Sequence, residues 1–383
     1  MKVVIAQSDL TQLISRTQSV ASAKPAIPIL STILLEAVDD QLIVSATDLT
    51  VSMRCHASAK VIEEGSIALP ARRFFQLIRE LTASQIKITA GSDGIAHITA
   101  GSSTFKVHGM QKSEFPSLPD LHGSIQVAFP STKLKEMFVK SAFSAAREDS
   151  RFVLNGVLLK IANNHAIFIG TDGKRLAKVM TGVEIDPSFQ GSYIIPLKAV
   201  EEMIKLIEDT ESRAYLNVMH DKVSIEYNSL ILYAKLLTGQ YPDVERVIPE
   251  TTTARIVLHR EELISLLRQV ALFTSDMTSS VRFIFEEGSL HLSATSHDIG
   301  EGNVAMPIDY SGEKIEIAFN PYYFLDILKH CKDETVQFAI KDAYNPGLVT
   351  DSTSALFVIM PMRLSDPVIS APSQNVSEDP VLT

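Results

Sequence analysis

The sequence predicts an α+β fold of three repeated domains, and the first reason is a motif that recurs at a fixed spacing. Residues 168–179 run an apolar strand into the turn-forming residues 171–173 and then into a second alternating run. The same strand, Thr and turn recur at 42–53 and 290–298. The spacing is equal, because 171 − 47 = 124 and 295 − 171 = 124. A chain of 383 residues holds three such repeats, each large enough for its own core.

Two helix signatures accompany each repeat. One is an amphipathic helix after an opening strand, with one stripe of mostly apolar residues at the i, i+3, i+4, i+7 spacing, at 10–17, 134–141 and 263–270. The other is a helix entered from a strand through Pro70, Pro196 or the pair at 320–321. Proline is tolerated at a helix start because its missing N–H would be unpaired there. We therefore expect two helices per repeat.

Short alternating runs supply the sheets. Residues 86–89 with 96–99, and 214–218 with 222–227, are typical of antiparallel hairpins. About eight short strands per repeat accompany only two helices, so the helices are expected to pack on one side of antiparallel sheets.

Pro-containing connectors at 114–120 and 240–249 mark the domain boundaries. They predict a first domain at 1–123, a second at 124–250 and a third at 251–364. Residues 365–383 are rich in Ser, Pro and acid, and we expect a disordered C-terminal tail there.

Composition excludes several classes of function. Two isolated cysteines and ten scattered histidines contain no CxxC or HExxH pattern, so we expect neither a structural disulfide nor a metal or other cofactor. The N-terminus lacks a signal peptide and no stretch approaches a membrane span of about 20 apolar residues, which predicts a cytoplasmic protein. The net charge of −10 is adverse for a DNA-binding protein unless the basic residues gather on one face.

Basic residues do recur on the predicted helices, for example Arg72, Arg73, Lys133, Lys140 and Lys198. One interpretation is simple solvation of helix surfaces. The other is that repeated helices line a common surface toward a phosphate backbone. Six helices at about 10 Å each enclose a ring too narrow for a duplex, whereas twelve leave about 28 Å clear. A ring around DNA therefore needs two chains, and a twofold dimer is the commonest oligomer.

No active site is evident in the sequence. Asp172 stands beside Lys174 and Arg175, but Thr-Asp-Gly at a strand end more often makes a turn than acid–base chemistry. The apolar run at 358–364, with two methionines, is either ordinary core or an adaptable site for peptide docking. We therefore expect no enzyme activity.

The sequence resembles the bacterial sliding clamp family, the β subunit of DNA polymerase III, in the combination of four motifs. These are RFVLNG at 151–156, TDGKRL at 171–176, YPDVERV at 241–247 and VIMPMRL at 358–364. The resemblance runs from Met1 to about Leu364. It implies a head-to-tail homodimeric ring of six similar domains that encircles duplex DNA, with helices inside and sheets outside. It also implies a groove that binds linear motifs of the polymerase α subunit, the clamp loader, other polymerases and repair proteins, and so confers processivity in DNA replication.

Matching positions assign residues to each role. The resemblance places the peptide groove at Leu154, Thr171, Gly173, Lys174, Arg175, Leu176, Pro242, Arg246, Val247, Val358, Met360, Pro361, Met362, Arg363 and Leu364. It places Lys24, Arg72, Arg73 and Lys198 toward DNA, and Phe105, Leu272 and Phe273 at the dimer contact. Two positions depart from the family: Lys174 stands where His is usual, and Leu197 where Arg is frequent.

Two other classes of function stay open on the residues alone. One is a repeat-built interaction scaffold that does not bind DNA, and the other is an enzyme that uses Asp172. Charge reversal at Arg72 and Arg73 distinguishes the scaffold from a DNA-encircling protein, because only the latter loses DNA loading.

Overall fold

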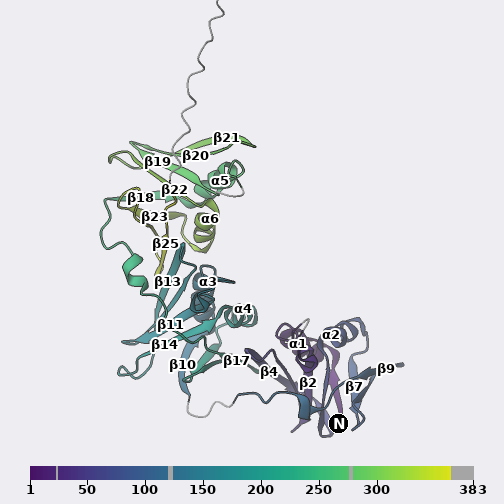
Figure 1. Ribbon diagram of the computed structural model, residues 1–383. Coiled ribbons are helices and arrows are strands. Elements are labelled where there is room, and N and C mark those ends of the chain that lie inside the picture. Colours follow the sequence, from purple (N-terminus) through teal and green to yellow (C-terminus); the bar gives the residue numbers. More distant parts are fainter. Residues whose placement is uncertain (23–24, 120–123, 276–278, 364–383) are drawn as a thin grey trace, which may run out of the picture. The chain divides into compact units, whose positions relative to one another are not determined.

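The computed structural model describes residues 1–22, 25–119, 124–275 and 279–363. Lys24, Leu364 and the predicted tail at 365–383 lie outside these residues. The chain forms two compact units (Figure 1). The first contains Met1–Ile248, Lys329–Asp333 and Leu348–Val358, and the second contains Pro249–Leu328, Glu334–Gly347 and the chain from Ile359.

The described residues contain two α-helices in each predicted repeat, which confirms that expectation. They are α1 (Gln7–Thr17), α2 (Ala71–Glu80), α3 (Ser131–Ala142), α4 (Leu197–Leu206), α5 (Arg260–Ala271) and α6 (Pro321–His330). Short 3₁₀ turns connect other elements: η1 (Pro28–Ser31), η2 (Lys112–Glu114), η3 (Phe152–Leu154) and η4 (Val244–Val247).

The first unit holds a five-stranded sheet and an eight-stranded sheet. The five-stranded sheet has the order β5 (Lys60–Glu63), β1 (Lys2–Ala6), β7 (Gln85–Ala90), β8 (Ile95–Ala100), β9 (Ser103–His108). The eight-stranded sheet has the order β10 (Ile125–Pro130), β15 (Arg213–Val218), β16 (Lys222–Tyr227), β17 (Leu230–Lys235), β4 (Val51–Ser58), β3 (Gln41–Thr47), β2 (Thr32–Val38), β6 (Gly65–Pro70). In this sheet β17 of the second repeat pairs antiparallel with β4 of the first.

The same arrangement recurs one repeat later in the first unit. The strand order there is β14 (Gly191–Pro196), β11 (Gly156–Ala162), β12 (His165–Thr171), β13 (Arg175–Gly182), β25 (Ala355–Ile359), β24 (Gly347–Thr350). In the second unit β18 (Ala254–His259) pairs with β23 (Thr335–Ile340). A further sheet there has the order β21 (Gly300–Pro307), β20 (Ser289–Ser296), β19 (Val281–Glu286), β22 (Ile315–Phe319).

Each helix buries one face against a sheet. On α1 the buried residues are those of the predicted stripe, Leu10, Leu13, Ile14 and Thr17. In the second unit the core is aromatic: Phe283 is fully buried, with ring centroids 5.3 Å from both Phe319 and Phe324. The opposite face of each helix stays exposed and carries polar side chains.

In four helices the first amide donates to a remote carbonyl rather than to a local side-chain cap; in α4 it is Leu197 N, which donates to Asn155 O at 2.9 Å. The first amide of α1, from Gln7, donates to Ser84 O at 3.0 Å. Ser131 N of α3 donates to Ser212 O at 2.9 Å, and Arg260 N of α5 to Glu334 O at 2.9 Å. These bonds satisfy an N–H that a helix start otherwise leaves unpaired. None of these four helices has a side-chain hydrogen bond from its N-cap residue.

Cys55 and Cys331 are both buried free thiols. Among the described helices, none is both long enough and apolar enough to cross a membrane.

Candidate functional site

The turn between β12 and β13 is held by its own side chains. Asp172 Oδ1 accepts the backbone N–H groups of Lys174 and Arg175 at 2.9 and 3.0 Å. Thr171 Oγ1 accepts the amide of Gly173 at 3.1 Å and donates to the carbonyl of Arg175 at 2.6 Å. The Asp172 carboxylate thus serves the turn, which is the interpretation that its sequence context favoured.

The first repeat contains the same turn between β3 and β4. Asp48 Oδ1 accepts the amides of Thr50 and Val51 at 2.9 and 2.7 Å. Leu49, with φ of 75°, stands where Gly173 stands with φ of 83°. The equal spacing read from the sequence therefore reflects one repeated local structure, and glycine is the less strained residue at its tip.

We expect Gly173→Ala to destabilise the first unit by about 1–2 kcal/mol, because an L-residue is strained at positive φ. An added Cβ would also lie 3.1 Å from Arg151 Nη2. Urea unfolding measures this cost. Gly182→Ala, where an added Cβ meets only Asn164 O at 4.0 Å, is the control and should stay near the parent.

An apolar cluster lies beside this turn in the first unit, and we refer to it as the docking groove. Its buried members are Leu158, Ile169, Leu176, Ile194, Val244 and Val358. Tyr241 packs against the cluster and donates from its hydroxyl to Ile169 O at 3.4 Å. A cavity of about 700 Å³ opens along it beneath the connector at 236–245. The groove is concave and apolar with a few polar groups, which is the form of a peptide or ligand site.

The structure brings together some of the predicted groove residues. Leu176 and Val358 lie in the cluster, and Pro242 lines the cavity. Leu154 is buried at the end of η3, and Arg246 and Val247 are exposed on η4. Sequence reasoning missed Ile169, Ile194 and Val244, because an apolar residue on a strand or connector looks like ordinary core.

Arg175 extends from this turn toward an aromatic pair. Its guanidinium carbon lies 5.5 Å from the ring centroid of Phe143, and Nε contacts Asp172 Oδ2 at 3.2 Å. The Phe143 ring stacks on His330, with centroids 4.0 Å apart. Arg175 is therefore positioned by an ion pair and a cation–π contact.

The remaining predicted groove residues belong to the second unit. Met360 is 36% exposed, Pro361 and Met362 are half-buried and Arg363 is exposed. The amide of Met362 donates to Ala318 O at 2.8 Å, so this segment lies beside β22. Their membership of the groove stays a prediction, as does that of Leu364, which lies outside the described residues.

The basic residues assigned to DNA lie on exposed helix faces. Arg72 and Arg73 project from α2, and neither forms an ion pair with a described residue. Lys198 on α4 is exposed but pairs with Asp48, which offsets part of its charge. Leu197, where the family often has Arg, is buried at the start of α4.

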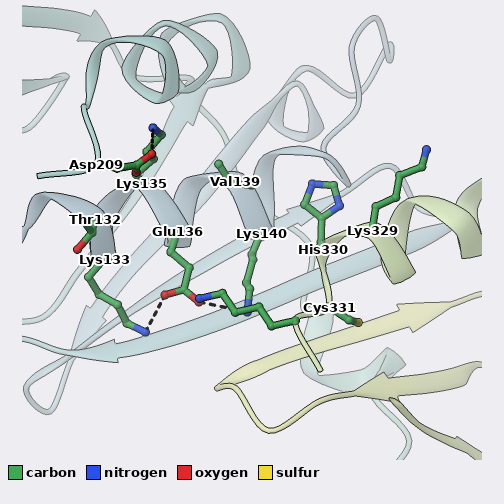
Figure 2. Close-up of a pocket in the computed structure, with 11 residues that line it drawn as sticks. Thr132, Lys133, Lys135, Glu136, Val139, Lys140, Asp209, Lys329, His330 and Cys331 are labelled. Carbon is green, nitrogen blue, oxygen red and sulfur yellow. Dashed lines mark hydrogen bonds and ion pairs between the residues drawn. The ribbon is translucent and has the colours of Figure 1, made fainter. Parts of the chain in front are cut away.

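A second cluster of cations lies where α3 meets the residues that follow α6 (Figure 2). The cavity there measures about 540 Å³ and is lined by Lys133, Lys135, Lys140, Lys329 and Lys332, with His330. Figure 2 shows Lys133 pointing toward Glu136, and Lys135 toward Asp209. The excess of positive charge makes this cavity suited to anions such as phosphate.

Glu136 holds this cluster together. Its carboxylate lies 3.2 Å from Lys133 Nζ, 3.2 Å from Lys140 Nζ and 3.0 Å from Lys332 Nζ. Burial by itself raises the pKa of Glu136, but the hydrogen bonds from the three lysines outweigh it and lower the pKa from 4.5 to about 2. Lys140 is only 4% exposed and also donates to Thr353 Oγ1 at 2.8 Å.

The residues assigned to the dimer contact lie at two sheet edges. Phe105 is half-buried on β9, the last strand of the five-stranded sheet. In the second unit Leu272 is 72% exposed, and Phe273 packs so closely on Gly302 of edge strand β21 that an added Cβ would lie 2.5 Å from its ring. Exposed apolar residues beside an open edge are typical of an association surface.

Comparison with known proteins identifies the family over nearly the whole chain. Residues 1–119, 128–243 and 245–363 match the N-terminal, central and C-terminal domains of the DNA polymerase III beta subunit. The beta sliding clamp of Chlamydia muridarum is 51% identical, over 96% of this chain and 100% of that protein. The beta sliding clamp of Vibrio cholerae is 30% identical, over 95% of this chain and 100% of that protein.

A solved structure gives the same result. The DNA polymerase III subunit beta of Pseudomonas aeruginosa superposes with a TM-score of 0.92 at 26% identity, over 95% of this chain and 100% of that one. The three domain matches are consecutive, the relatives align from end to end, and the architecture is shared. The chain therefore belongs to the family of the DNA polymerase III beta subunit, the beta sliding clamp.

Proposed function

We propose that two copies of this chain form a ring that encircles duplex DNA and tethers the replicative polymerase, and that this DNA sliding clamp has no catalytic activity of its own. The observation that carries the proposal is the segregation of charge. The chain has a net charge of −10, yet Arg72 and Arg73 are exposed on α2, and Lys133 and Lys135 of α3 line a cavity rich in lysine. Sequence-independent contact with phosphates needs such a surface and nothing more specific.

The test is topological, because a ring is retained by linkage rather than by affinity. Loaded onto a nicked circular plasmid by a clamp loader, the protein should stay bound through gel filtration at moderate salt. Cutting the plasmid once should release it. Equal loss from circular and linear DNA would overturn the proposal and favour the scaffold without DNA.

The open sheet edges support the head-to-tail dimer. In the eight-stranded sheet β17 pairs with β4, and one repeat later β25 lies beside β13. β9 of the first repeat corresponds to β17 and β25, and β21 of the third repeat corresponds to β4 and β13. Among the described strands of these two kinds, β9 and β21 are left without such a partner. We infer that β9 of one chain lies against β21 of its partner, with Phe105 near the partner's Leu272 and Phe273.

Leu272→Asp should raise the dissociation constant of the dimer by about tenfold or more, because it places a charge in an apolar contact. Sedimentation at several concentrations measures the effect. Tyr344→Asp is the control, because Tyr344 is another exposed large side chain of the second unit, at 88%. A dimer affinity that Leu272→Asp leaves unchanged would place the contact elsewhere.

The docking groove is proposed to bind short linear motifs of the polymerase, the clamp loader and repair proteins. Val247 is 37% exposed at the end of η4, the turn that also carries the cluster member Val244, so its truncation should cost little stability. We expect Val247→Ala to weaken binding of a fluorescent motif peptide about threefold to fivefold, because the substitution removes two methyl groups that the bound peptide partly buries. Val257→Ala, on a 52% exposed valine outside the groove, should leave peptide affinity unchanged.

Three further features belong to the proposal. They are domain boundaries near 123, 250 and 364, function without a cofactor, and location in the cytoplasm. The unpaired Arg72 and Arg73 and the partly compensated Lys198 are the described residues assigned to DNA.

A further inference from the structure

A second cavity lies over the first repeat, apart from the docking groove and from the helix faces. It measures about 350 Å³ and is covered by the connector at 115–119. Leu34, Ser45 and Arg54 form its floor on β2, β3 and β4, where Leu34 pairs with Ser45 and Ser45 with Arg54. Paired residues of antiparallel strands project from the same face of a sheet. We refer to this cavity as the first-repeat pocket.

The first-repeat pocket is the counterpart of the docking groove. Three residues of the groove lie one repeat spacing, 124 positions, after residues of the first repeat. The pairs are Leu158 with Leu34, Ile169 with Ser45, and Leu176 with Ser52. The covering segments correspond as well, because Met110 bridges to Ala68 as Leu237 bridges to Ile194. The architecture is kept, but Ser45 on the floor of the pocket stands where the groove has the apolar Ile169, and Ser52 stands where the groove has Leu176.

Two polar groups of the pocket are not satisfied by the described part of the chain. Ser45 is fully buried and its hydroxyl has no hydrogen-bond partner there, a condition that costs about 1–3 kcal/mol. Arg54 is half-buried and forms no ion pair with a described residue. The neighbouring Lys112 differs, because it pairs with Glu36 at 2.6 Å. The pocket therefore contains one uncompensated cation beside an unused donor.

We propose that the first-repeat pocket binds a small carboxylic acid with an apolar body. A guanidinium presents two parallel N–H groups that match a carboxylate, and the Ser45 hydroxyl supplies a third donor. Leu34, Phe115 and Leu118 provide the apolar wall. The Glu36 carboxylate also lines the pocket, which favours a singly charged acid over a phosphate dianion. This site goes beyond the proposed clamp function and does not depend on it.

The probe for the test is N-acetyl-L-phenylalanine, titrated by ligand-observed NMR against the full chain. The neutral N-acetyl-L-phenylalaninamide has the same apolar body and should bind at least about tenfold more weakly, the loss of one charge-assisted pair. A hexapeptide with a C-terminal phenylalanine and a free carboxylate forms the third arm. If N-acetyl-L-phenylalanine and the hexapeptide both bind, the pocket accepts the C-terminus of a polypeptide chain. If only N-acetyl-L-phenylalanine binds, the pocket is restricted to free organic acids. Either result supports the site.

Variants separate binding from folding. Arg54→Gln should weaken binding of the acid at least about tenfold. Lys178→Gln, at the equivalent position 124 residues later on β13, should leave binding of the acid unchanged. Ser45→Ala should weaken binding of the acid about threefold. It should nevertheless leave the urea midpoint of the ligand-free protein equal or higher, because the substitution removes an unsatisfied hydroxyl. Equal affinity for acid and amide, unchanged binding in Arg54→Gln, or no binding of the acid at 20 mM would each overturn the proposal.

Discussion

Charge reversal of Arg72 and Arg73 to Glu should weaken the affinity for a linear DNA duplex on the order of 100-fold at low salt. Each phosphate contact contributes about 0.9 to the slope of log affinity against log salt, so losing two should reduce that slope by about 2. Both side chains are exposed on α2 and form no ion pair with a described residue, so the substitution should not disturb packing. The dissociation constant for a linear duplex, measured between 50 and 300 mM salt, reports both effects.

The matched control is Lys60→Glu with Lys87→Glu. These two lysines are exposed on β5 and β7 of the same repeat, away from the proposed dimer strand β9, and their reversal changes the net charge by the same amount. If the position of the charges matters, the control keeps the parent's affinity for the linear duplex. Equal losses of affinity in the two variants would instead attribute DNA binding to overall charge, which contradicts a specific basic helix face.

Glu136→Gln is expected to destabilise the first unit by about 3 kcal/mol at pH 7, because it removes the carboxylate from a buried lysine. Lys140, 4% exposed, would keep only Thr353 as a hydrogen-bond partner for its charge among the contacts described above. The pKa of Glu136 is depressed in the folded protein, so its contribution is fully present above about 4.5 and is lost as pH falls toward 2. The difference between parent and variant should therefore shrink across that window.

Urea unfolding at pH 7, 4.5 and 2.5 measures this prediction. Glu245→Gln is the control: Glu245 pairs with Lys178 at 2.6 Å but is 60% exposed, and a surface pair contributes at most about 1 kcal/mol. A constant difference between parent and Glu136→Gln at all three pH values would show that packing, rather than the charge of Glu136, is responsible.

The sequence was sufficient for features that are local and repeated. The stripe from Leu10 to Thr17 and the prolines at 70 and 196 located helices, because helix periodicity and proline chemistry act within a few residues. The turn at 171–175 could be interpreted because Asp and Gly have specific roles in turns.

Features that join distant residues could not be predicted. Lys133 and Lys140 suggested a helix surface, but Lys332, which shares Glu136 with them, lies far along the chain. Nothing near Glu136 in the sequence indicates that its carboxylate contacts all three lysines. Ser45 looks like any polar strand residue until its neighbours Leu34 and Arg54 define a cavity. The helix starts at Gln7, Ser131 and Arg260 likewise depend on carbonyls supplied by later hairpins.

The pairing of β17 with β4 has a consequence for errors of assembly. The contact is heterologous, because one kind of edge meets a different kind. Such contacts close into a ring only when the rotation at every junction sums to a full circle, and otherwise they generate open helical filaments. Substitutions that change sheet twist near Arg54 or Ile231 without unfolding the chain should therefore yield soluble polymers of folded protein. The angle at this junction therefore decides between a ring and a filament, separately from the stability of the junction.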